Sequence, residues 1–221
     1  KNTRSIVLYN NQGSSNMQYA FNDDFEEIQV GLDEAGRGSL AGSVTVAAVI
    51  WDPNIHDKQS DMIKDSKKLS KKKRESLRHY IEENAVAYHV EHVSNEIIDE
   101  INVSQATMLG MHRCLTEIDK KKRFERILVD GNYFKPFMCH IHNCVEKGDN
   151  KYISIAAASI LAKVHHDEVV KELLVEIPDA DDKYGWSSNM CYGTPRHLAG
   201  IVEHGLTKYH RRSFCSKYLT T

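Results

Sequence analysis

Two apolar segments of this chain end in acidic residues, and a third segment, with a long helical pattern, carries a further one. The segment VGLDE ends in Asp33 and Glu34, ILVD ends in Asp130, and AKVHHDEVV contains Asp167. A carboxylate at the end of a buried strand is costly unless a positive charge lies beside it. Three such segments suggest a shared cation, and carboxylate oxygens are ligands that Mg²⁺ and Mn²⁺ prefer.

Runs of apolar residues predict five strands, and longer periodic segments predict helices. We expect strands at residues 27–34, 43–51, 85–93, 125–130 and 136–148, and helices at residues 70–85, 102–122, 154–177 and 195–204. Ser70 and Asn102 stand where side chains cap the first two of these helices. The order of elements predicts an α/β fold with a mixed five-stranded sheet flanked by helices, not a repeating βαβ arrangement.

The acidic residues fall at the ends of predicted strands or on a helix that can lie against the sheet, where ligand sites gather in open sheets. Adjacent strand residues point to opposite faces, so Asp33 and Glu34 can share a metal only if the strand ends or bulges there. The sequence AGRG directly after them supplies such a break. On the helix, Ser159, Lys163 and Asp167 are spaced by four residues and share one face.

Each of these features also has a simpler explanation when it is taken alone. Asp33, Glu34 and Asp130 fit solvated acidic turns that follow strands. Lys163 and Asp167 fit an exposed ion pair, which contributes little stability. Together, the three acidic segments fit one metal cluster better. In such a cluster, two Mg²⁺ ions can activate a water and stabilise the leaving oxygen of a phosphodiester.

Two further features beside the acidic residues suit a nucleic-acid ligand. Gly36 and Gly38 flank Arg37, and glycines let the backbone approach a sugar hydroxyl closely, although a plain tight turn explains them as well. A basic cluster crowds a loop and the start of the helix at 70–85. Cations at the start of a helix oppose its dipole, which hints at phosphate contacts. A solvated basic face explains the cluster equally well. The cluster consists of Lys64, Lys67, Lys68, Lys71, Lys72, Lys73 and Arg74.

The composition excludes several classes of protein. A net charge of −2 provides no global attraction for nucleic acid, so such binding depends on local patches. No apolar run approaches the ~18 residues that a membrane span needs, and we expect no signal peptide. Five cysteines without framework spacing fit reduced thiols in the cytoplasm. The segment CHIHNC lacks the second half of a zinc site, and strand alternation explains it better.

Short motifs follow one another in order from about Val30 to Phe214. They are GLDEAGRGSLAGSV, DSKKLS, INVSQAT, LVDGN, EKGD, SIAAASILAKVHHD, CYGTPRH and HRRSF. As an ordered set they resemble the ribonuclease HII family, the type 2 ribonucleases H, far more specifically than any single motif does. The resemblance implies an RNase H-like fold with a C-terminal helical segment. We expect a polar extension at 1–25, a catalytic domain at 26–184 and a substrate-contacting helical segment at 185–221, the last two in one compact unit.

The resemblance also implies an activity. It implies hydrolysis of the RNA strand of RNA–DNA hybrids and cleavage 5′ of single ribonucleotides in duplex DNA, with 3′-hydroxyl and 5′-phosphate ends. The cofactor would be Mg²⁺ or Mn²⁺, with two ions at the site. The protein would be a cytoplasmic monomer that removes ribonucleotides and RNA primers during DNA replication and repair.

The resemblance assigns roles to eight residues. The catalytic, metal-binding carboxylates would be Asp33, Glu34, Asp130 and Asp167. A backbone loop would read the ribose 2′-hydroxyl, the group that distinguishes RNA from DNA; its residues are Gly36, Arg37 and Gly38. Tyr192 would stack at the RNA–DNA junction. As part of the same hypothesis, we expect Lys67 and Lys163 to contact phosphates of the substrate.

Four positions depart from the usual family pattern. Ser39 and Ser43 stand where proline is usual, so we expect a looser loop after the glycines. His166 stands where arginine is usual, so we expect a weaker phosphate contact or ion pair. Cys191 replaces a common glycine before the junction tyrosine, so we expect a shift of that tyrosine and an altered preference for junctions.

Three alternatives stay open at this point. The sister family, ribonuclease HIII, carries glycine-lysine-glycine where this chain has glycine-arginine-glycine. A non-catalytic hybrid-binding module gains nothing from four clustered carboxylates. A subunit of a larger complex, as in eukaryotic relatives, is disfavoured because GRGSLAGSVTVAAVI looks like the bacterial single-chain form.

Overall fold

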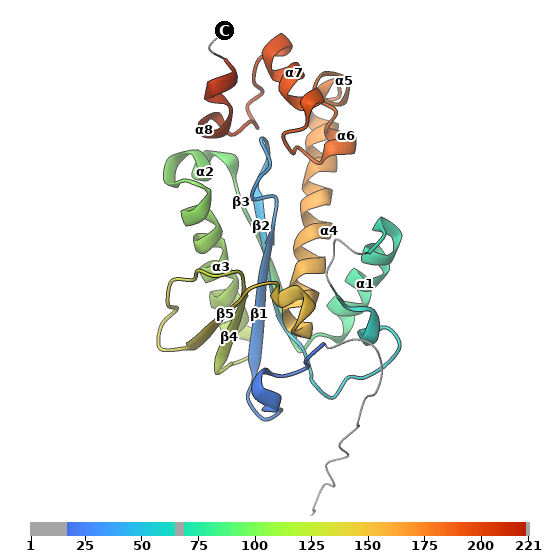
Figure 1. The fold of residues 1–221 in the computed structure, drawn as a ribbon, viewed down its shortest axis with the longest axis vertical. Coiled ribbons are helices and arrows are strands. Elements are labelled where there is room, and N and C mark those ends of the chain that lie inside the picture. Colours follow the sequence, from blue (N-terminus) through green and yellow to red (C-terminus); the bar gives the residue numbers. More distant parts are fainter. Residues whose placement is uncertain (1–16, 65–68, 220–221) are drawn as a thin grey trace, which may run out of the picture.

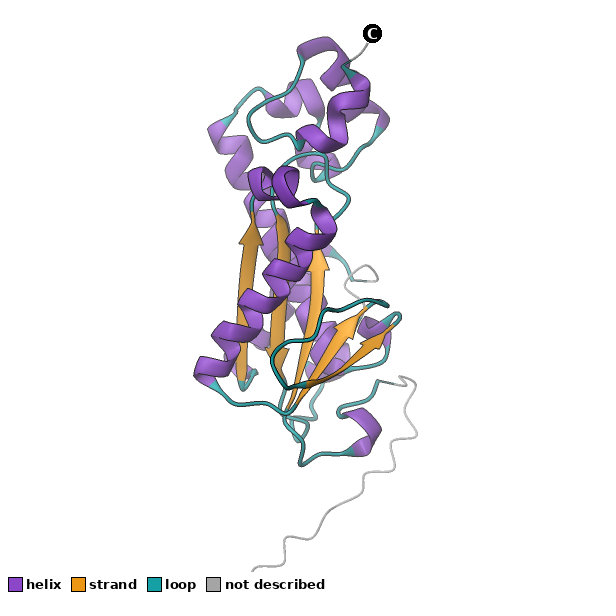
Figure 2. Ribbon diagram, turned by 90° about the vertical axis from the view of Figure 1, so that its left-hand side faces the viewer, coloured by secondary structure: helices purple, strands orange, loops and turns teal. Residues whose placement is uncertain are grey.

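Five strands form one mixed sheet in the order β3-β2-β1-β4-β5 (Figure 2). The computed structural model describes residues 17–64 and 69–219. β1 pairs antiparallel with β2 and parallel with β4; β2 pairs antiparallel with β3, and β4 parallel with β5. The strands are β1 Gln29–Ala35, β2 Val44–Ile50, β3 Ala87–Val93, β4 Arg126–Asp130 and β5 Ile141–Val145.

Helices cover both faces of this sheet and one of its ends. In Figure 1, α2 and α3 lie on one side of the strands, α1 and α4 lie on the other, and α5 to α8 gather beyond the far end of β1. The α-helices are α1 Lys71–Asn84, α2 Asn95–Ile101, α3 Val103–Lys121, α4 Ile153–Glu176, α5 Ala180–Tyr184, α6 Trp186–Asn189, α7 Pro195–His204 and α8 Arg212–Cys215. Short 3₁₀ helices lie at Phe21–Asp23, Ser60–Met62, Gly148–Asn150 and Ser216–Tyr218.

The predicted strands and the long helices are confirmed, and both predicted caps form. The Ser70 side chain accepts a hydrogen bond from the Lys73 amide, and the Asn102 side chain accepts one from the Gln105 amide. These contacts satisfy backbone donors that the first turn of a helix leaves without partners. The fifth strand is shorter than expected, and α2 was not foreseen because its seven residues are too few for a clear helical period.

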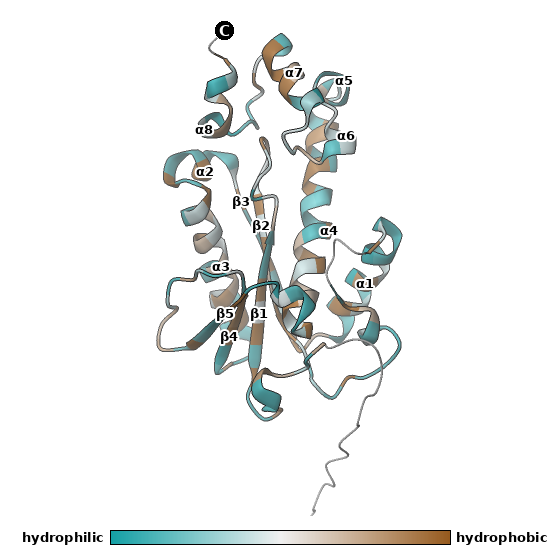
Figure 3. Cartoon of the chain, viewed as in Figure 1, coloured by the Kyte–Doolittle hydropathy of each residue, from teal (hydrophilic) through white to brown (hydrophobic). Residues whose placement is uncertain are grey.

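Two hydrophobic cores fill the layers on either side of the sheet. Val30 and Leu32 face one core, which includes Met111 and Leu115 of α3. Ala47 and Val49 face the other, which includes the apolar first half of α4. Figure 3 shows hydrophobic residues along the central strands and α4, whereas α1 is mostly hydrophilic. β2 is therefore buried on both faces, as its uninterrupted apolar sequence indicates.

α4 approaches β1 unusually closely. A Cβ placed on Gly31 would lie 2.3 Å from the backbone carbonyl carbon of Ser154 and 2.4 Å from the amide nitrogen of Ile155. Only a residue without a side chain fits between the strand and the helix there. The small residues in the first half of α4 predict close packing, and this glycine is where the helix comes close to the sheet. From there the helix runs alongside β1.

The two ends of the described chain both pack onto the body. Part of the expected polar extension is bound, because the Gln18 amide donates to the Lys151 carbonyl over 2.6 Å and Ala20 is buried. At the other end, α5 to α8 enclose a third cluster built around Trp186 and Ile201. That cluster includes Leu40 from the loop after β1. Within the described residues, no helix is long and apolar enough to cross a membrane.

Candidate active site

Asp33 and Asp130 lie beside each other on neighbouring parallel strands. Leu32 is the register partner of Val129, so the next residue on each strand is an aspartate. Asp33 is 7% exposed. Burial raises the pKa of Asp33 well above its ordinary value, and the negative charges of Glu34 and Asp130 raise it further. The parallel pairing of β1 and β4 thus concentrates negative charge at one point of the sheet.

Neutral donors hold these two aspartates in place. The Ser159 hydroxyl on α4 hydrogen-bonds the Asp33 carboxylate, which also accepts the Glu34 amide over 2.7 Å. The Gly148 amide donates to Asp130 Oδ1 over 2.6 Å. These donors offset part of the cost of burying the carboxylates and fix their orientation.

Glu34 differs from Asp33 in the face of the sheet that it occupies. β1 pairs regularly with β2 through Ala35, so the strand neither ends nor bulges between the two acidic residues as the sequence suggested. By alternation, Asp33 shares the α4 face with Gly31, and Glu34 shares the α3 face with Leu32. The break comes at Gly36, whose φ is +78°. The Glu34 carboxylate lies 3.6 Å from Arg37 Nη1.

Asp167 and Lys163 form an ion pair on α4. Lys163 Nζ lies 2.7 Å from Asp167 Oδ1, and the two side chains are 24% and 10% exposed, so the pair is partly buried and not the exposed pair considered from the sequence. The Ser159–Lys163–Asp167 face of α4 does point toward β1, since Ser159 contacts Asp33. Asp167 lies two turns further along α4, next to the glycine loop.

The four carboxylates are suited to a divalent cation but are not gathered into a ready coordination shell. Within residues 17–64 and 69–219, no three His, Cys, Asp or Glu side chains are arranged to hold a metal ion. The donor chemistry nevertheless fits Mg²⁺ or Mn²⁺, because all four groups supply hard oxygens. Burial, and then repulsion from Glu34 and Asp130, raise the pKa of Asp33, and a cation would relieve that repulsion.

The loop of Gly36, Arg37 and Gly38 begins where β1 ends. Gly36 needs to be glycine because of its positive φ and because a Cβ there would lie 2.3 Å from the ring of His166. Arg37 and Gly38 are exposed, and Arg37 Nη2 donates to the Ser104 hydroxyl at the start of α3 over 3.2 Å. The loop therefore lies between α3 and α4, next to the acidic residues.

Tyr192 lies against this loop. Its hydroxyl accepts a hydrogen bond from the Gly36 amide over 3.2 Å, and its backbone forms a bridge with Ser39. A Cβ on Gly38 would be in ordinary contact with the Tyr192 ring, 3.7 Å away. Tyr192 is 37% exposed. Cys191 before it has φ +63°, a conformation that favours glycine and explains why glycine would suit that position.

Two buried histidines form a hydrogen-bonded chain that ends at the backbone of Tyr192. The Tyr192 carbonyl accepts a hydrogen bond from His197 Nδ1 over 3.0 Å. His197 Nε2 accepts from the Trp186 indole and from His210 Nε2, each over 3.1 Å. His210 Nδ1 in turn accepts the Thr207 amide over 2.9 Å. This pattern of donors requires both rings to be neutral.

The positions that depart from the family pattern meet at the same loop. His166 is fully buried, and burial lowers its pKa to about 4, so the ring is neutral near pH 7 and offers no charge to a phosphate. Ser39 Oγ lies 3.5 Å from His166 Nε2, and the Ser39 amide donates to the Gly36 carbonyl over 3.2 Å. Proline could not supply that N–H. Ser43 is buried in the same loop.

Several contacts were not foreseen from the sequence. The motifs INVSQAT, EKGD and HRRSF include Ser104, Gly148 and Arg211, but they do not reveal which groups these residues contact. Arg211 donates four hydrogen bonds to carbonyls of the glycine loop and the residues that follow it. Lys67, an expected phosphate contact, lies outside the described residues.

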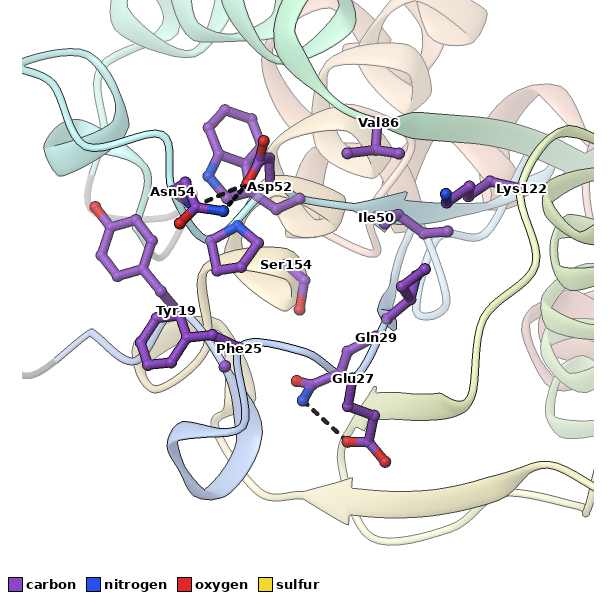
Figure 4. Close-up of a pocket in the computed structure, with 14 residues that line it drawn as sticks. Tyr19, Phe25, Glu27, Gln29, Ile50, Asp52, Asn54, Val86, Lys122 and Ser154 are labelled. Atoms are coloured by element: carbon purple, nitrogen blue, oxygen red, sulfur yellow. Dashed lines mark hydrogen bonds between the residues drawn. The ribbon is translucent and has the colours of Figure 1, made fainter. Parts of the chain in front are cut away.

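A separate cavity lies at the opposite end of β1. It has a volume of about 210 Å³, and Gln29, Ile50, Trp51, Lys122 and Ser154 are among the residues that line it (Figure 4). Gln29 opens β1 and Ile50 closes β2, so the cavity is separated from Asp33 and the glycine loop by the length of the strand. It takes no part in the site described here.

Comparison with known proteins agrees with this arrangement. Residues 30–217 match the family model for ribonuclease HII. The chain is 46% identical to the ribonuclease HII of Cytophaga hutchinsonii over 188 residues, covering 85% of this chain and 89% of that one. It is 48% identical to the ribonuclease HII of Christiangramia forsetii over 184 residues, covering 83% and 88%.

Solved structures share the fold. The ribonuclease H2 of Pyrococcus horikoshii OT3 superposes with a TM-score of 0.72 at 22% identity, covering 87% of this chain and 99% of that one. A ribonuclease HIII named Bst-RNase HIII, solved with Mn²⁺, gives a TM-score of 0.71 at 20% identity, covering 87% and 69%. The fold, the family match and the sequence relatives agree, so this chain belongs to the ribonuclease HII family and is a nuclease of the ribonuclease H type.

Proposed function

We propose that this protein hydrolyses the RNA strand of RNA–DNA hybrids and cuts 5′ of single ribonucleotides embedded in duplex DNA. The products would carry 3′-hydroxyl and 5′-phosphate ends. The observation that carries the proposal is the contact between Tyr192 and Gly36, at the end of the strand that bears Asp33 and Glu34. A ring that can stack on a nucleotide thus adjoins a backbone loop that can reach a sugar and carboxylates that can hold metal ions.

The four carboxylates would hold two divalent cations, Mg²⁺ or Mn²⁺. Asp33 and Asp130 would hold both ions, and Glu34 and Asp167 would complete the set of ligands. Bound there, the cations would lower the pKa of a water and stabilise the oxygen that leaves the phosphodiester. Ser159 and the Gly148 amide keep Asp33 and Asp130 oriented for this task.

The glycine loop would select the ribonucleotide. A 2′-hydroxyl both donates and accepts hydrogen bonds, and the backbone of Gly36, Arg37 and Gly38 offers both kinds of partner. The exposed Tyr192 ring would stack on the sugar or base at the junction where RNA passes into DNA. Together these contacts would set the preference for a ribonucleotide followed by DNA.

Lysine side chains would contact the phosphates on either side of the cleavage point. Lys163 is the described candidate, and it would exchange its bond to Asp167 for one to a phosphate oxygen. Lys67 is the second candidate. Because the chain carries a net charge of −2, such local contacts would supply the attraction for the nucleic acid.

We further infer that the protein works as a cytoplasmic monomer in DNA replication and repair. Its substrates there would be misincorporated ribonucleotides and the RNA of primers. Two features support this inference: all five cysteines are free thiols, and the bacterial relatives carry the same family name over most of the chain.

A cleavage assay tests the proposal. The substrates are a labelled DNA duplex with one ribonucleotide, the same duplex without it, and a long RNA–DNA hybrid, each with Mg²⁺ and with Mn²⁺. We expect a single cut 5′ of the ribonucleotide and no cut in all-DNA duplex. Asp130→Asn should be inactive, whereas Asp61→Asn, at an exposed acid outside the site, should act like the wild type.

Two results would refute the proposal. One is the absence of any metal-dependent cut by the wild type, which, if it still bound hybrids tightly, would indicate a binding module. The other is full cleavage by Asp130→Asn. Cleavage of long hybrids without cleavage at single ribonucleotides would instead indicate the specificity of ribonuclease HIII.

A further inference from the structure

A buried arginine in the C-terminal segment binds the backbone of the glycine loop. Arg211 is 0% exposed. Its Nη2 donates to the carbonyls of Gly36 and Ser43 over 2.7 and 3.0 Å, its Nη1 to Arg37 over 2.9 Å and its Nε to Gly42 over 3.0 Å. The planar fork of the guanidinium thus joins both ends of the loop that follows β1.

Backbone dipoles provide the main stabilisation of this buried charge. Among the described residues, no carboxylate lies within ion-pair distance of the Arg211 guanidinium. Burial lowers the pKa of Arg211 to about 10, so the side chain stays charged near neutral pH. An unpaired buried charge is expensive, and four carbonyl acceptors aimed at it are what make the position tolerable. A lysine could not satisfy four acceptors in these directions.

The main chain around Arg211 runs beside the same loop. The Arg211 amide donates to the Leu40 carbonyl over 2.8 Å, and the Gly42 amide donates to the Tyr209 carbonyl over 2.9 Å. Between them, Ala41 and His210 form a bridge. Residues 209–211 therefore extend the loop into a short paired segment, and the guanidinium reaches beyond it to Gly36 and Arg37.

These bonds determine which way the peptide groups of the loop face. In a trans peptide, the C=O and the following N–H point in opposite directions. Because the carbonyls of Gly36 and Arg37 point inward to Arg211, the amides of Arg37 and Gly38 point away from it. Arg37 and Gly38 are the exposed residues of the loop. Their donors are thereby presented on the side where a ribose could approach.

We propose that Arg211 is a positioning residue for ribonucleotide recognition, which orients the amides of the glycine loop toward the sugar 2′-hydroxyl. It touches neither the substrate nor a metal, and it acts through the peptide planes of Gly36 and Arg37. The proposal rests on the function proposed above, in which this loop reads the 2′-hydroxyl. It assigns to the C-terminal segment a part in substrate choice as well as in folding.

Binding measurements without cleavage test the proposal. Fluorescence anisotropy in EDTA gives the Kd for a duplex with one ribonucleotide and for the same all-DNA duplex, and the ratio of the two measures discrimination. The variants are Arg211→Lys, which keeps the charge but loses the planar fork, and Arg211→Ala with and without added guanidinium ion. Arg212→Ala is the matched control, because this neighbouring arginine is exposed.

We expect Arg211→Lys to lose discrimination while keeping its affinity for all-DNA duplex. Loss of one well-oriented hydrogen bond to the sugar corresponds to a fall in the ratio of about tenfold. In the presence of metal, kcat/KM for the single-ribonucleotide substrate should fall by a similar factor. Millimolar guanidinium should restore the ratio in Arg211→Ala, and Arg212→Ala should keep the wild-type ratio.

Several outcomes would overturn the proposal. One is an unchanged ratio in folded Arg211→Lys and Arg211→Ala; another is an equal loss of affinity for both duplexes. Failure of both variants to fold, judged by circular dichroism and Tm, would also overturn it, since the residue would then be purely structural. If the wild type shows no preference for the ribonucleotide at all, the proposed reading of the 2′-hydroxyl itself is wrong, which is a distinct result.

Discussion

The backbone N–H of Gly36 donates a hydrogen bond to the hydroxyl of Tyr192 over 3.2 Å. These residues are 156 positions apart in the chain. The bond connects the loop proposed to read the sugar with the ring proposed to stack beside it, so a movement of either one displaces the other. A partly exposed hydrogen bond of this kind contributes about 1 kcal/mol.

Substitutions at Tyr192 should separate the hydrogen bond from the ring. Tyr192→Phe keeps the stacking surface and loses the acceptor for Gly36, so we expect kcat/KM at a single ribonucleotide to fall by less than about tenfold. Tyr192→Ala also removes stacking, which is worth ~1–3 kcal/mol per base, and should cost about ten- to a hundredfold more. Steady-state cleavage of the junction substrate measures both; equal losses in the two variants would contradict this division.

Asp33→Asn should abolish activity and yet stabilise the metal-free protein. The pKa of Asp33 is raised above its ordinary value of 3.8 by burial and by Glu34 and Asp130, so ionisation at higher pH weakens the folded state. A neutral amide removes this penalty, so we expect the free energy of unfolding near pH 7 to increase. Urea denaturation in EDTA measures it.

The matched variant for this experiment is Asp167→Asn. Asp167 is paired with Lys163, so neutralising it should lower stability where Asp33→Asn raises it. A loss of stability in both variants would show that repulsion at Asp33 is outweighed by its hydrogen bonds to Ser159 and to the Glu34 amide.

Acid should destabilise the protein through its buried histidines. Burial lowers the pKa of His197, and it lowers the pKa of His210 to about 3. In the unfolded chain histidine binds a proton near pH 6.5. Between about pH 6.5 and pH 3 the unfolded state therefore holds more protons at His210, so the stability from this group is full above the window and falls by up to ~1.4 kcal/mol per pH unit as the pH drops. His197 adds to the decline in the same direction.

Unfolding midpoints in urea, measured from neutral to acid pH, test this expectation. His210→Gln should lower stability at neutral pH and flatten its decline in acid, because one of the buried histidines that take up a proton on unfolding is gone. His79→Gln, at an exposed histidine of α1, should leave the profile unchanged. Parallel profiles for His210→Gln and the wild type would argue against the assignment.

Lys163→Met should reveal whether this lysine contacts a phosphate. If Lys163 exchanges Asp167 for a phosphate oxygen on binding, the slope of log K against log salt for duplex binding should decrease by about one contact. The measurement is a salt titration of duplex affinity in EDTA. An unchanged slope would leave Lys163 as a partner of Asp167 alone.

Gly31→Ala should disrupt the packing of α4 on β1. The new Cβ would lie 2.3 Å from the Ser154 backbone, which cannot move without shifting the helix. We expect a loss of ~3 kcal/mol or more in the free energy of unfolding, the upper range for overpacking. Gly38→Ala is the control for stability, because its Cβ would be in ordinary contact with Tyr192; a similar loss in both variants would contradict the packing argument.

Local patterns were enough to predict most of the fold. The strands and long helices follow from apolar periodicity, and Ser70 and Asn102 cap helices because their side chains can reach the amides of the first turn. The close approach of α4 is visible in its small residues. The helix α2 escaped prediction because it completes only about two turns between β3 and α3.

The site was less accessible to sequence reasoning. Because a glycine loop follows Asp33 and Glu34, the sequence suggested a break in the strand that lets both side chains face one site. Regular pairing through Ala35 instead places them on opposite faces of the sheet. The contact between Arg211 and Gly36 spans 175 positions, and no local pattern reports a pair so distant. The basic cluster near Lys71 could be recognised as unusual because its cations oppose the helix dipole.

The pairing of residues 209–211 with the loop after β1 bears on how the enzyme is made. Synthesis proceeds from the N-terminus, so β1 and its acidic residues leave the ribosome early. The loop beyond them cannot form its bonds to Arg211 until residues 209–211 have also emerged. A nascent chain can therefore form the sheet before residues 209–211 are available to hold the loop of Gly36, Arg37 and Gly38 in place.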